Sequence, residues 1–193
     1  MISIVIPFRP NESCDITLKT LQTQTYKDFE TIIIEDSEQR GANWARNQGA
    51  LQAKGEMLLF SDSDIHWFSN ALETMLAYLY TFQKVSYCYG QYTMGGKIYC
   101  NRDFDPEVLK QINYISTMSL MRTKDFPGFD ENIKRLQDWD LWLTMLKQGK
   151  IGINCKTILF TTNIREGISC GKTIPKEGYE EAVKIVKTKH GLI

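Results

Sequence analysis

Three short apolar runs near the start of the chain alternate with three stretches whose apolar residues recur at helical spacing. The runs span residues 2–6, 29–34 and 57–60, and the stretches span residues 15–25, 42–53 and 69–84. The first run is rich in β-branched residues and ends at Pro7, which is typical of a strand buried on both faces. Ser69 is a candidate N-cap for the third helix. This order predicts an α/β fold with a doubly wound, mostly parallel sheet.

The second half of the chain is less regular, and its pattern predicts four strands and three helices. The strands are expected at residues 85–93, 97–100, 115–121 and 151–160, and the helices at residues 106–112, 138–147 and from 176 onward. Gly95-Gly96 predicts a hairpin turn between the first two of these strands. No linker or repeat divides the chain, so we expect one domain over residues 1–175 and a helical tail over 176–193 packed on or near it.

Charge and cysteine content exclude several classes of protein. Lys+Arg and Asp+Glu both total 23, so the basic excess of a nucleic-acid-binding protein is missing. The five cysteines contain no C-x-x-C pair, which favours free thiols in a reducing cytoplasm. No transmembrane segment or signal sequence is visible, which also favours a cytoplasmic location. The basic stretch at residues 184–190 leaves two alternatives, a packed surface helix, which we favour, or a peripheral contact with an anionic membrane.

Acidic residues follow two of the predicted strands at the point where each strand ends. Glu35 and Asp36 come directly after the second strand, and Asp62 and Asp64 follow the third. Ligands bind at the carboxyl ends of parallel strands in open α/β sheets. An Asp-x-Asp pair offers the oxygen ligands that Mg²⁺ or Mn²⁺ takes together with substrate phosphates. The pattern indicates a nucleotide-phosphate ligand held through a metal, although Asp and Ser are also common turn residues.

Five segments resemble, in order, the motifs of family 2 glycosyltransferases. They are SIVIPF with IIIEDS, NWARNQG, GEMLLFSDSD, GFDE and QDWDLWL, which cover roughly residues 1–165. The resemblance implies the GT-A fold of nucleotide-diphospho-sugar transferases, an α/β fold with a mostly parallel central sheet and a small second sheet. It implies a hexosyltransferase of glycan or polysaccharide biosynthesis that uses a nucleotide sugar, with UDP as the expected nucleotide, and a glycan, lipid-linked or protein acceptor.

The resemblance assigns donor-binding and metal-binding roles to five residues. Pro7 and Asp36 are expected to bind the nucleotide, with Asp36 accepting a hydrogen bond from the base. Arg46 is expected at the base or the diphosphate, where a guanidinium suits either partner. Asp62 is expected at the ribose or at metal-bound water, and Asp64 is expected to bind Mn²⁺ or Mg²⁺ directly.

The same resemblance implies an inverting, metal-dependent transfer in which Asp138 is the general base. Arg165 is expected to neutralise the leaving diphosphate from a loop that closes over it. Trp139 and Asp140 are candidate acceptor contacts, with core packing and a structural acceptor role as their respective alternatives. The motif usually has Glu where this chain has Gln137.

Two alternative functions and the role of His66 remain open at this stage. An inactive nucleotide-sugar-binding module would explain Gln137, and a nucleotidyltransferase would also combine a nucleotide site with acidic metal ligands. His66, two residues after Asp64, either completes the metal shell or is an exposed loop histidine, which we favour.

Overall fold

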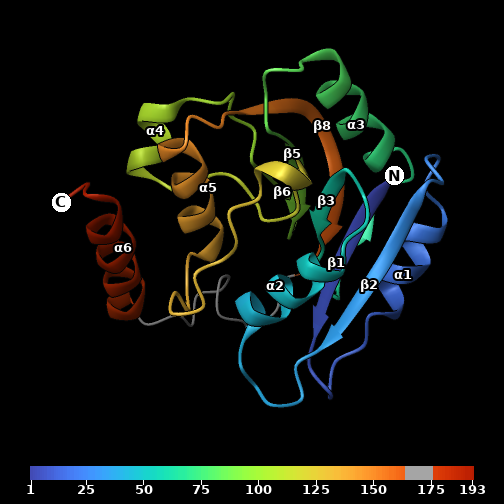
Figure 1. The fold of residues 1–193 in the computed structure, drawn as a ribbon, viewed down its shortest axis with the longest axis horizontal. Coiled ribbons are helices and arrows are strands. Elements are labelled where there is room, and N and C mark those ends of the chain that lie inside the picture. The colour runs from blue at the N-terminus through green and yellow to red at the C-terminus, as the bar shows by residue number, and fades with distance from the viewer. Residues whose placement is uncertain (164–175) are drawn as a thin grey trace.

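The computed structural model describes residues 1–163 and 176–193, which form a sheet with helices on both faces (Figure 1). The strands are β1 (Ile2–Phe8), β2 (Phe29–Glu35), β3 (Met57–Phe60), β4 (His66–Trp67), β5 (Tyr87–Met94), β6 (Lys97–Tyr99), β7 (Leu120–Arg122) and β8 (Gly152–Thr162). The helices are α1 (Asp15–Gln22), α2 (Ala42–Gln52), α3 (Ala71–Thr81), α4 (Pro106–Gln111), α5 (Gln137–Lys147), α6 (Lys176–His190) and the 3₁₀ turn η1 (Thr123–Asp125). The predicted α/β class is confirmed.

The eight strands form one mixed sheet in the order β2-β1-β3-β7-β5-β8-β4, with β6 paired to β5. The pairs β1–β2, β1–β3 and β5–β8 are parallel, and the other four pairs are antiparallel. The sheet is therefore less parallel than predicted, and the hairpin belongs to it rather than to a second sheet. The β5–β6 pair is antiparallel because the Gly95-Gly96 turn leaves no room for the crossover that a parallel pair needs.

The neighbouring strands β1 and β2 differ in their positions in the sheet and in their burial. β1 lies between β2 and β3, and its first five residues are buried, as predicted. β2 is an edge strand, and most of its residues alternate between half-buried and exposed. Both strands run in the same direction, so Phe8 and Glu35 end side by side.

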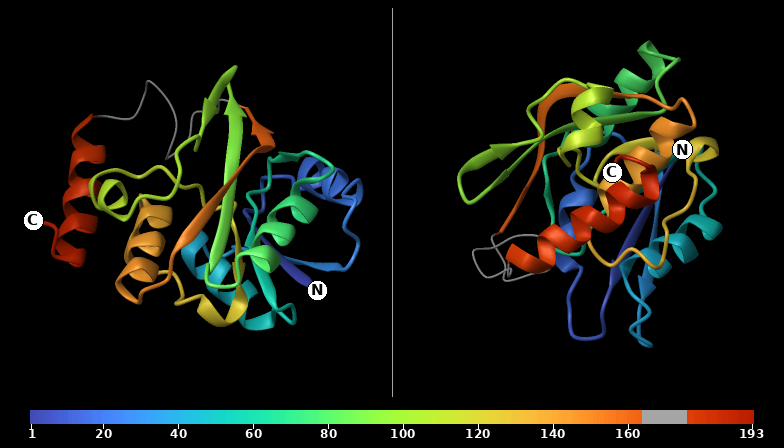
Figure 2. Two further views of the ribbon diagram at one scale, coloured as in Figure 1. Left: turned by 90° about the horizontal axis from the view of Figure 1, so that it is seen from above. Right: turned by 90° about the vertical axis from the view of Figure 1, so that its left-hand side faces the viewer.

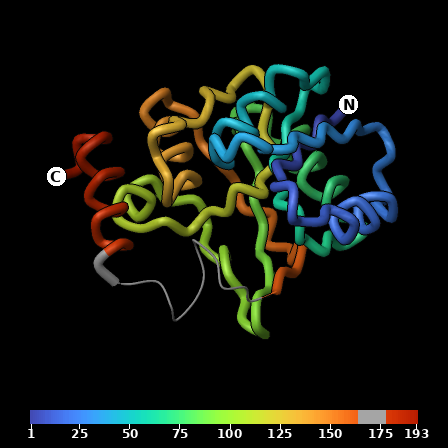
Figure 3. The backbone as a smooth tube through the Cα atoms, turned by 90° about the horizontal axis from the view of Figure 1, so that it is seen from below, coloured from blue at the N-terminus to red at the C-terminus, as the bar shows by residue number. Residues whose placement is uncertain are grey.

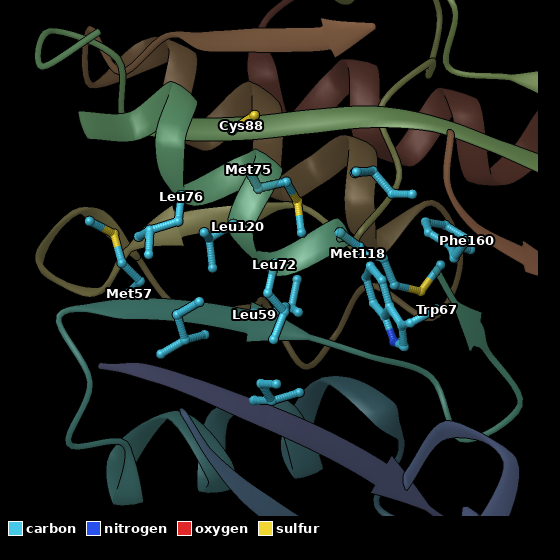
Figure 4. Close-up of a cluster of buried hydrophobic side chains, with 14 of the residues drawn as sticks. Met57, Leu59, Trp67, Leu72, Met75, Leu76, Cys88, Met118, Leu120 and Phe160 are labelled. Carbon is cyan, nitrogen blue, oxygen red and sulfur yellow. The ribbon is translucent and has the colours of Figure 1, made fainter. Parts of the chain in front are cut away.

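Two buried clusters cover the two faces of the sheet. One joins Ile2, Ile4 and Ile6 to α1 and α3. Within it, Leu72 and Met75 of α3 lie over Leu59 of β3 (Figure 4). The other cluster lies on the opposite face and joins alternate strand residues to α4, α5 and α6. The alternation of side chains along a strand explains how one β1 strand supplies both cores.

The predicted strand at residues 115–121 is much shorter in the structure, because only Leu120–Arg122 pairs with neighbouring strands. Ser116 accounts for the difference. Its Oγ accepts a hydrogen bond from Met118 N, and its carbonyl accepts one from Ser119 Oγ. Such local side-chain bonds compete with pairing in a sheet. Ser69 also does not cap α3, which begins after Asn70, and the two-residue strand β4 was not predicted.

The C-terminal helix α6 packs beside α5 at the end of the molecule away from β2 (Figures 1 and 2). The β5–β6 hairpin projects from the body on another side (Figure 3). None of the helices in residues 1–163 and 176–193 has the length and apolar character needed to cross a bilayer. Cys14, Cys88, Cys100 and Cys155 are free thiols, as predicted, and Cys170 lies outside the described residues.

Candidate functional site

The carboxyl ends of β1 and β2 bring Pro7 and Asp36 together. Pro7 pairs in register with Ile34, and Asp36 N donates to Phe8 O at 2.9 Å. The Asp36 carboxylate is buried and accepts hydrogen bonds from the backbone N–H groups of Arg40 and Gly41, at 2.8 and 2.7 Å. Asp36 therefore fixes the loop that leads into α2. Its oxygens keep lone pairs that these two bonds do not use.

Arg46 of α2 forms an ion pair with Asp62 in the loop that follows β3. Its Nη2 lies 2.9 Å from Asp62 Oδ1, and the two side chains are 9% and 45% exposed. Gly49 allows this approach, because a Cβ at that position would lie 2.2 Å from Val5 Cγ1 of β1. A larger residue would push α2, and Arg46 with it, away from the sheet. The motif glycine thus has a packing role in building the site.

Asp138 lies in the first turn of α5, half-buried, with Oδ1 accepting a hydrogen bond from Trp139 N at 2.9 Å. Burial raises the pKa of Asp138, and a hydrogen bond from Asn113 and the positive charge of Arg46 partly oppose that rise. Arg46 thus acts on Asp138 electrostatically while it pairs with Asp62. The guanidinium joins α2 to the β3 loop by direct contact, and its positive charge also acts on Asp138 at the start of α5.

Asp64 and His66 are half-buried, as is Asp62, whereas Ser63 and Ile65 between them are buried. Among residues 1–163 and 176–193, no three His, Cys, Asp or Glu side chains gather closely enough to hold a metal ion. His66 is half-buried in β4 and paired with Thr161, so it is not the exposed loop histidine that we favoured. The carboxylates of Asp62 and Asp64 still fit Mg²⁺ or Mn²⁺, because such ions commonly take one or two carboxylates plus substrate phosphates.

Trp139 and Asp140, the two candidate acceptor contacts, are both buried and form hydrogen bonds within the protein. Trp139 is 1% exposed and its indole N–H donates to Leu109 O at 2.6 Å, so the core-packing alternative describes it. Asp140 is 3% exposed and accepts from Lys189 and His190 of α6, so the structural-acceptor alternative describes it. Neither side chain is presented to a ligand in this structure.

The remaining predictions concern three residues. Trp142 is fully buried and stacks on Tyr87, as expected of a core residue. Gln137 donates from Nε2 to Lys134 O at 2.9 Å and so has a local structural role. Arg165 lies outside the described residues, so its expected role remains a prediction.

Two asparagines of α2 have a role that the sequence interpretation missed. Asn47 accepts a hydrogen bond from Phe129 N and donates to Phe129 O, and Asn43 donates to Asp130 O and Ile133 O. These bonds tie the GFDE segment to α2. The available signal was spacing, because residues four apart lie on one face of a helix.

Comparison with known proteins places this geometry in context. The model of the family described as "Glycosyl transferase family 2" matches residues 13–130. Escherichia coli WfaP, named UDP-Glc:alpha-D-GlcNAc-diphosphoundecaprenol beta-1,3-glucosyltransferase, is 28% identical over 191 residues, covering 77% of this chain and 71% of WfaP. Escherichia coli WfgD, which carries the same enzyme name, is 25% identical over 192 residues, covering 80% of this chain and 74% of WfgD.

Solved structures of low sequence identity share the fold. S. aureus TarS 1-349 in complex with UDP-GlcNAc has a TM-score of 0.74 at 16% identity, over 96% of this chain and 65% of that one. The mannosyltransferase PcManGT from Pyrobaculum calidifontis, in complex with GDP-Man and Mn²⁺, has a TM-score of 0.64 at 15% identity, over 98% of this chain and 61% of that one. Against the longer TarS chain, this chain spans 39% of the length. The GT-A fold predicted from the sequence is confirmed.

Proposed function

The chain belongs to glycosyl transferase family 2, and from this premise we propose that it transfers a hexose from a UDP-sugar to an acceptor hydroxyl, with inversion at the anomeric carbon. The two Escherichia coli relatives are named for UDP-Glc and for a lipid-linked GlcNAc acceptor. UDP-glucose and a GlcNAc-diphospho-lipid are therefore the first donor and acceptor to test. Other UDP-hexoses, and glycan or protein acceptors, are the next.

The observation that carries this proposal is the ion pair of Arg46 with Asp62, together with the effect of the Arg46 charge on Asp138. Arg46 pairs with Asp62, which is 45% exposed, and it lowers the raised pKa of Asp138 without cancelling the effect of burial. The exposed Asp62 carboxylate beside the Arg46 guanidinium suits a charged nucleotide-sugar donor. A buried carboxyl with a raised pKa suits proton transfer.

In the proposed reaction, Asp138 takes the proton of the acceptor hydroxyl while that oxygen forms its bond to the anomeric carbon. The bond from that carbon to the diphosphate oxygen breaks on the opposite side, and UDP leaves with the electron pair. Arg46 offers positive charge to the diphosphate, and Asp36 receives the base at the end of β2. A bound Mn²⁺ or Mg²⁺ would add charge neutralisation at the diphosphate, with Asp64 and Asp62 as its protein ligands.

The raised pKa of Asp138 has a chemical consequence for this step. A carboxylate with a higher pKa is a stronger base, so it takes a hydroxyl proton more readily once it is ionised. Arg46 keeps that ionised form accessible, because its positive charge favours the carboxylate over the acid.

The test is transfer and donor hydrolysis with purified protein, Mn²⁺, UDP-glucose and a soluble GlcNAc-diphospho-lipid analogue. Release of UDP that accelerates with acceptor, together with a glucosylated product, supports the proposal. Binding of UDP-glucose with no UDP release, with or without any acceptor, would support the inactive binding module instead. We also propose a cytoplasmic location with peripheral membrane association, which a lipid-linked acceptor would require.

A further inference from the structure

Asp140 is a buried carboxylate held by two basic side chains of the C-terminal helix. Lys189 Nζ lies 2.8 Å from Oδ1 and 2.9 Å from Oδ2, and His190 Nε2 lies 2.8 Å from Oδ1. The Asp140 and His190 side chains are only 4% and 7% exposed. Polar groups this deeply buried are retained where they have hydrogen-bond partners, so these contacts anchor α6 to α5.

Lys189 also reaches the segment that precedes α5. Its Nζ lies 2.8 Å from Asp130 Oδ2, and this contact lowers the pKa of Asp130. Asn43 of α2 holds the backbone of the same residue, because its Nδ2 donates to Asp130 O at 2.7 Å. One lysine of α6 thus joins α5 to the segment that α2 holds, and α2 is the helix that carries Arg46. Figure 1 shows α6 alongside α5.

The first turn of α5, which carries Asp138, begins from an unfavourable backbone conformation. Leu136, the N-cap residue, has φ 58° and ψ 35°, and its side chain makes no capping hydrogen bond. A left-handed conformation is unfavourable for a non-glycine residue and persists only where surrounding contacts maintain it. Asp140, whose N–H donates to Leu136 O at 3.0 Å, closes this turn and receives the contacts from α6.

We propose that Lys189 and His190 are positioning residues that hold the first turn of α5, so that Asp138 keeps its place in that turn. Their action passes through Asp140 and Asp130, and neither residue touches the reacting atoms. This inference rests on the proposed function for its effect on rate, because Asp138 is the base only in that reaction. Its structural part, the fastening of α5 by α6, stands independently of any activity.

The decisive variant is Lys189→Met, which keeps the length of the side chain and removes its charge. Lys184→Met is the matched control, because Lys184 is an exposed lysine of the same helix. We expect Lys189→Met to lower kcat for transfer at least about tenfold, with the KM for donor changed less than about threefold. Lys189→Arg should recover most of the lost rate, whereas Lys184→Met should match the wild type.

Amide hydrogen exchange over residues 136–141 gives a second readout that does not depend on activity. Lys189→Met should speed exchange in this turn, with no change in residues 2–6 of β1. His190→Leu should act in the same direction, and it serves in place of Lys189→Met if that variant does not fold. A folded variant with wild-type exchange and wild-type kcat would overturn the inference. If the wild type itself shows no transfer, the proposed function fails, while the exchange experiment still decides whether α6 holds this turn.

Discussion

Arg46 and Asp62 form an ion pair that leaves part of each group available to a ligand. Nη2 and Oδ1 are 2.9 Å apart, and the Asp62 side chain is 45% exposed. Arg46 Nε is buried and has no hydrogen-bond partner within the described part of the chain. Buried polar atoms without partners are rare in folded proteins, and either a water molecule or a ligand atom would satisfy this one.

Arg46→Met should therefore weaken UDP binding by about tenfold to a hundredfold, as expected for loss of a hydrogen bond to a charged group. Arg46→Lys should recover only part of the affinity, because an ammonium lacks the planar fork of donors. Isothermal titration of UDP in the presence of Mn²⁺ measures both. Arg40→Ala is the control, since the Arg40 guanidinium pairs with Glu38 instead of a site carboxylate. Unchanged UDP affinity in Arg46→Met would remove this residue from the donor site.

Asp138→Asn should retain UDP binding and lose transfer by roughly 10²–10⁴-fold, the usual contribution of a positioned base. The amide keeps the shape of the side chain but cannot take the proton. Initial-rate kinetics with saturating donor separate the two effects. Gln137→Ala is the matched control on the same turn and should transfer at close to the wild-type rate. The opposite pattern, with Gln137→Ala inactive and Asp138→Asn active, would show that the base is misassigned.

The pH dependence of transfer should reflect the raised pKa of Asp138. Burial favours the protonated form, so the carboxyl loses its proton at a higher pH than an ordinary aspartate. As pH falls through that raised pKa, the base becomes protonated and kcat/KM for acceptor should decline. The same shift means that protonated Asp138 favours folding at low pH, and this contribution is lost as pH rises through the folded-state pKa.

A pH–rate profile and a pH series of thermal melts on wild type and Asp138→Asn check both statements. The usual pKa of an aspartate is about 4, and the decline in rate should begin at a pH above that value. The variant should show a weaker acid-side decline in its residual rate, and its melting temperature relative to wild type should increase as pH rises. A decline that lies wholly below about pH 4, or equal melting curves at every pH, would contradict this description of Asp138.

The first half of the fold was predictable because its signals are local. The runs at residues 2–6, 29–34 and 57–60 carry their own strand pattern, and helical stretches separate them. The position of Asp62 follows directly from the end of β3, and that of Asp36 from the end of β2. By contrast, the edge position of β2 depends on which strands pair with β1, and no local pattern in residues 29–34 reports it.

The structural roles of Trp139 and Asp140 depend on contacts from distant parts of the chain. The partner of Trp139 is the carbonyl of Leu109, and those of Asp140 are Lys189 and His190. A sequence read by spacing places both residues beside the proposed base but cannot tell which neighbours bury them. Asp138 differs because Arg46, whose charge acts on it, lies in a motif that was already linked to the same ligand.

Asp64→Ala should abolish the part of UDP affinity that depends on a divalent ion. If Asp64 is a metal ligand, removing its carboxylate leaves too few protein oxygens to hold the ion against the diphosphate. UDP titrations with Mn²⁺ and with EDTA should differ for the wild type and coincide for the variant. Asp28→Ala, at an exposed carboxylate that pairs with the N-terminus, is the control and should retain the Mn²⁺ dependence. Equal Mn²⁺ dependence in Asp64→Ala and wild type would reject Asp64 as a ligand.

Two glycine-to-alanine substitutions in helices should change stability in opposite directions. At Gly49, the added Cβ would lie 2.2 Å from Val5 Cγ1, inside a packed helix–sheet contact, so Gly49→Ala should destabilise by about 1–3 kcal/mol. At Gly178 of α6, the nearest atom is Arg135 Nη1 at 2.8 Å, at the end of a flexible side chain that can move. Gly178→Ala should therefore stabilise by up to about 1 kcal/mol, since alanine is the better helix former.

Thermal unfolding followed by circular dichroism measures both changes, at about 2–4 °C per kcal/mol for a chain of this length. Gly49→Ala should also weaken UDP binding, because α2 must move away from β1 and carries Arg46 with it. Gly178→Ala should leave UDP affinity unchanged, since Gly178 lies in α6, which packs on α5. A Gly49→Ala variant with wild-type stability and UDP affinity would mean that the close packing of α2 on β1 does not set the position of Arg46.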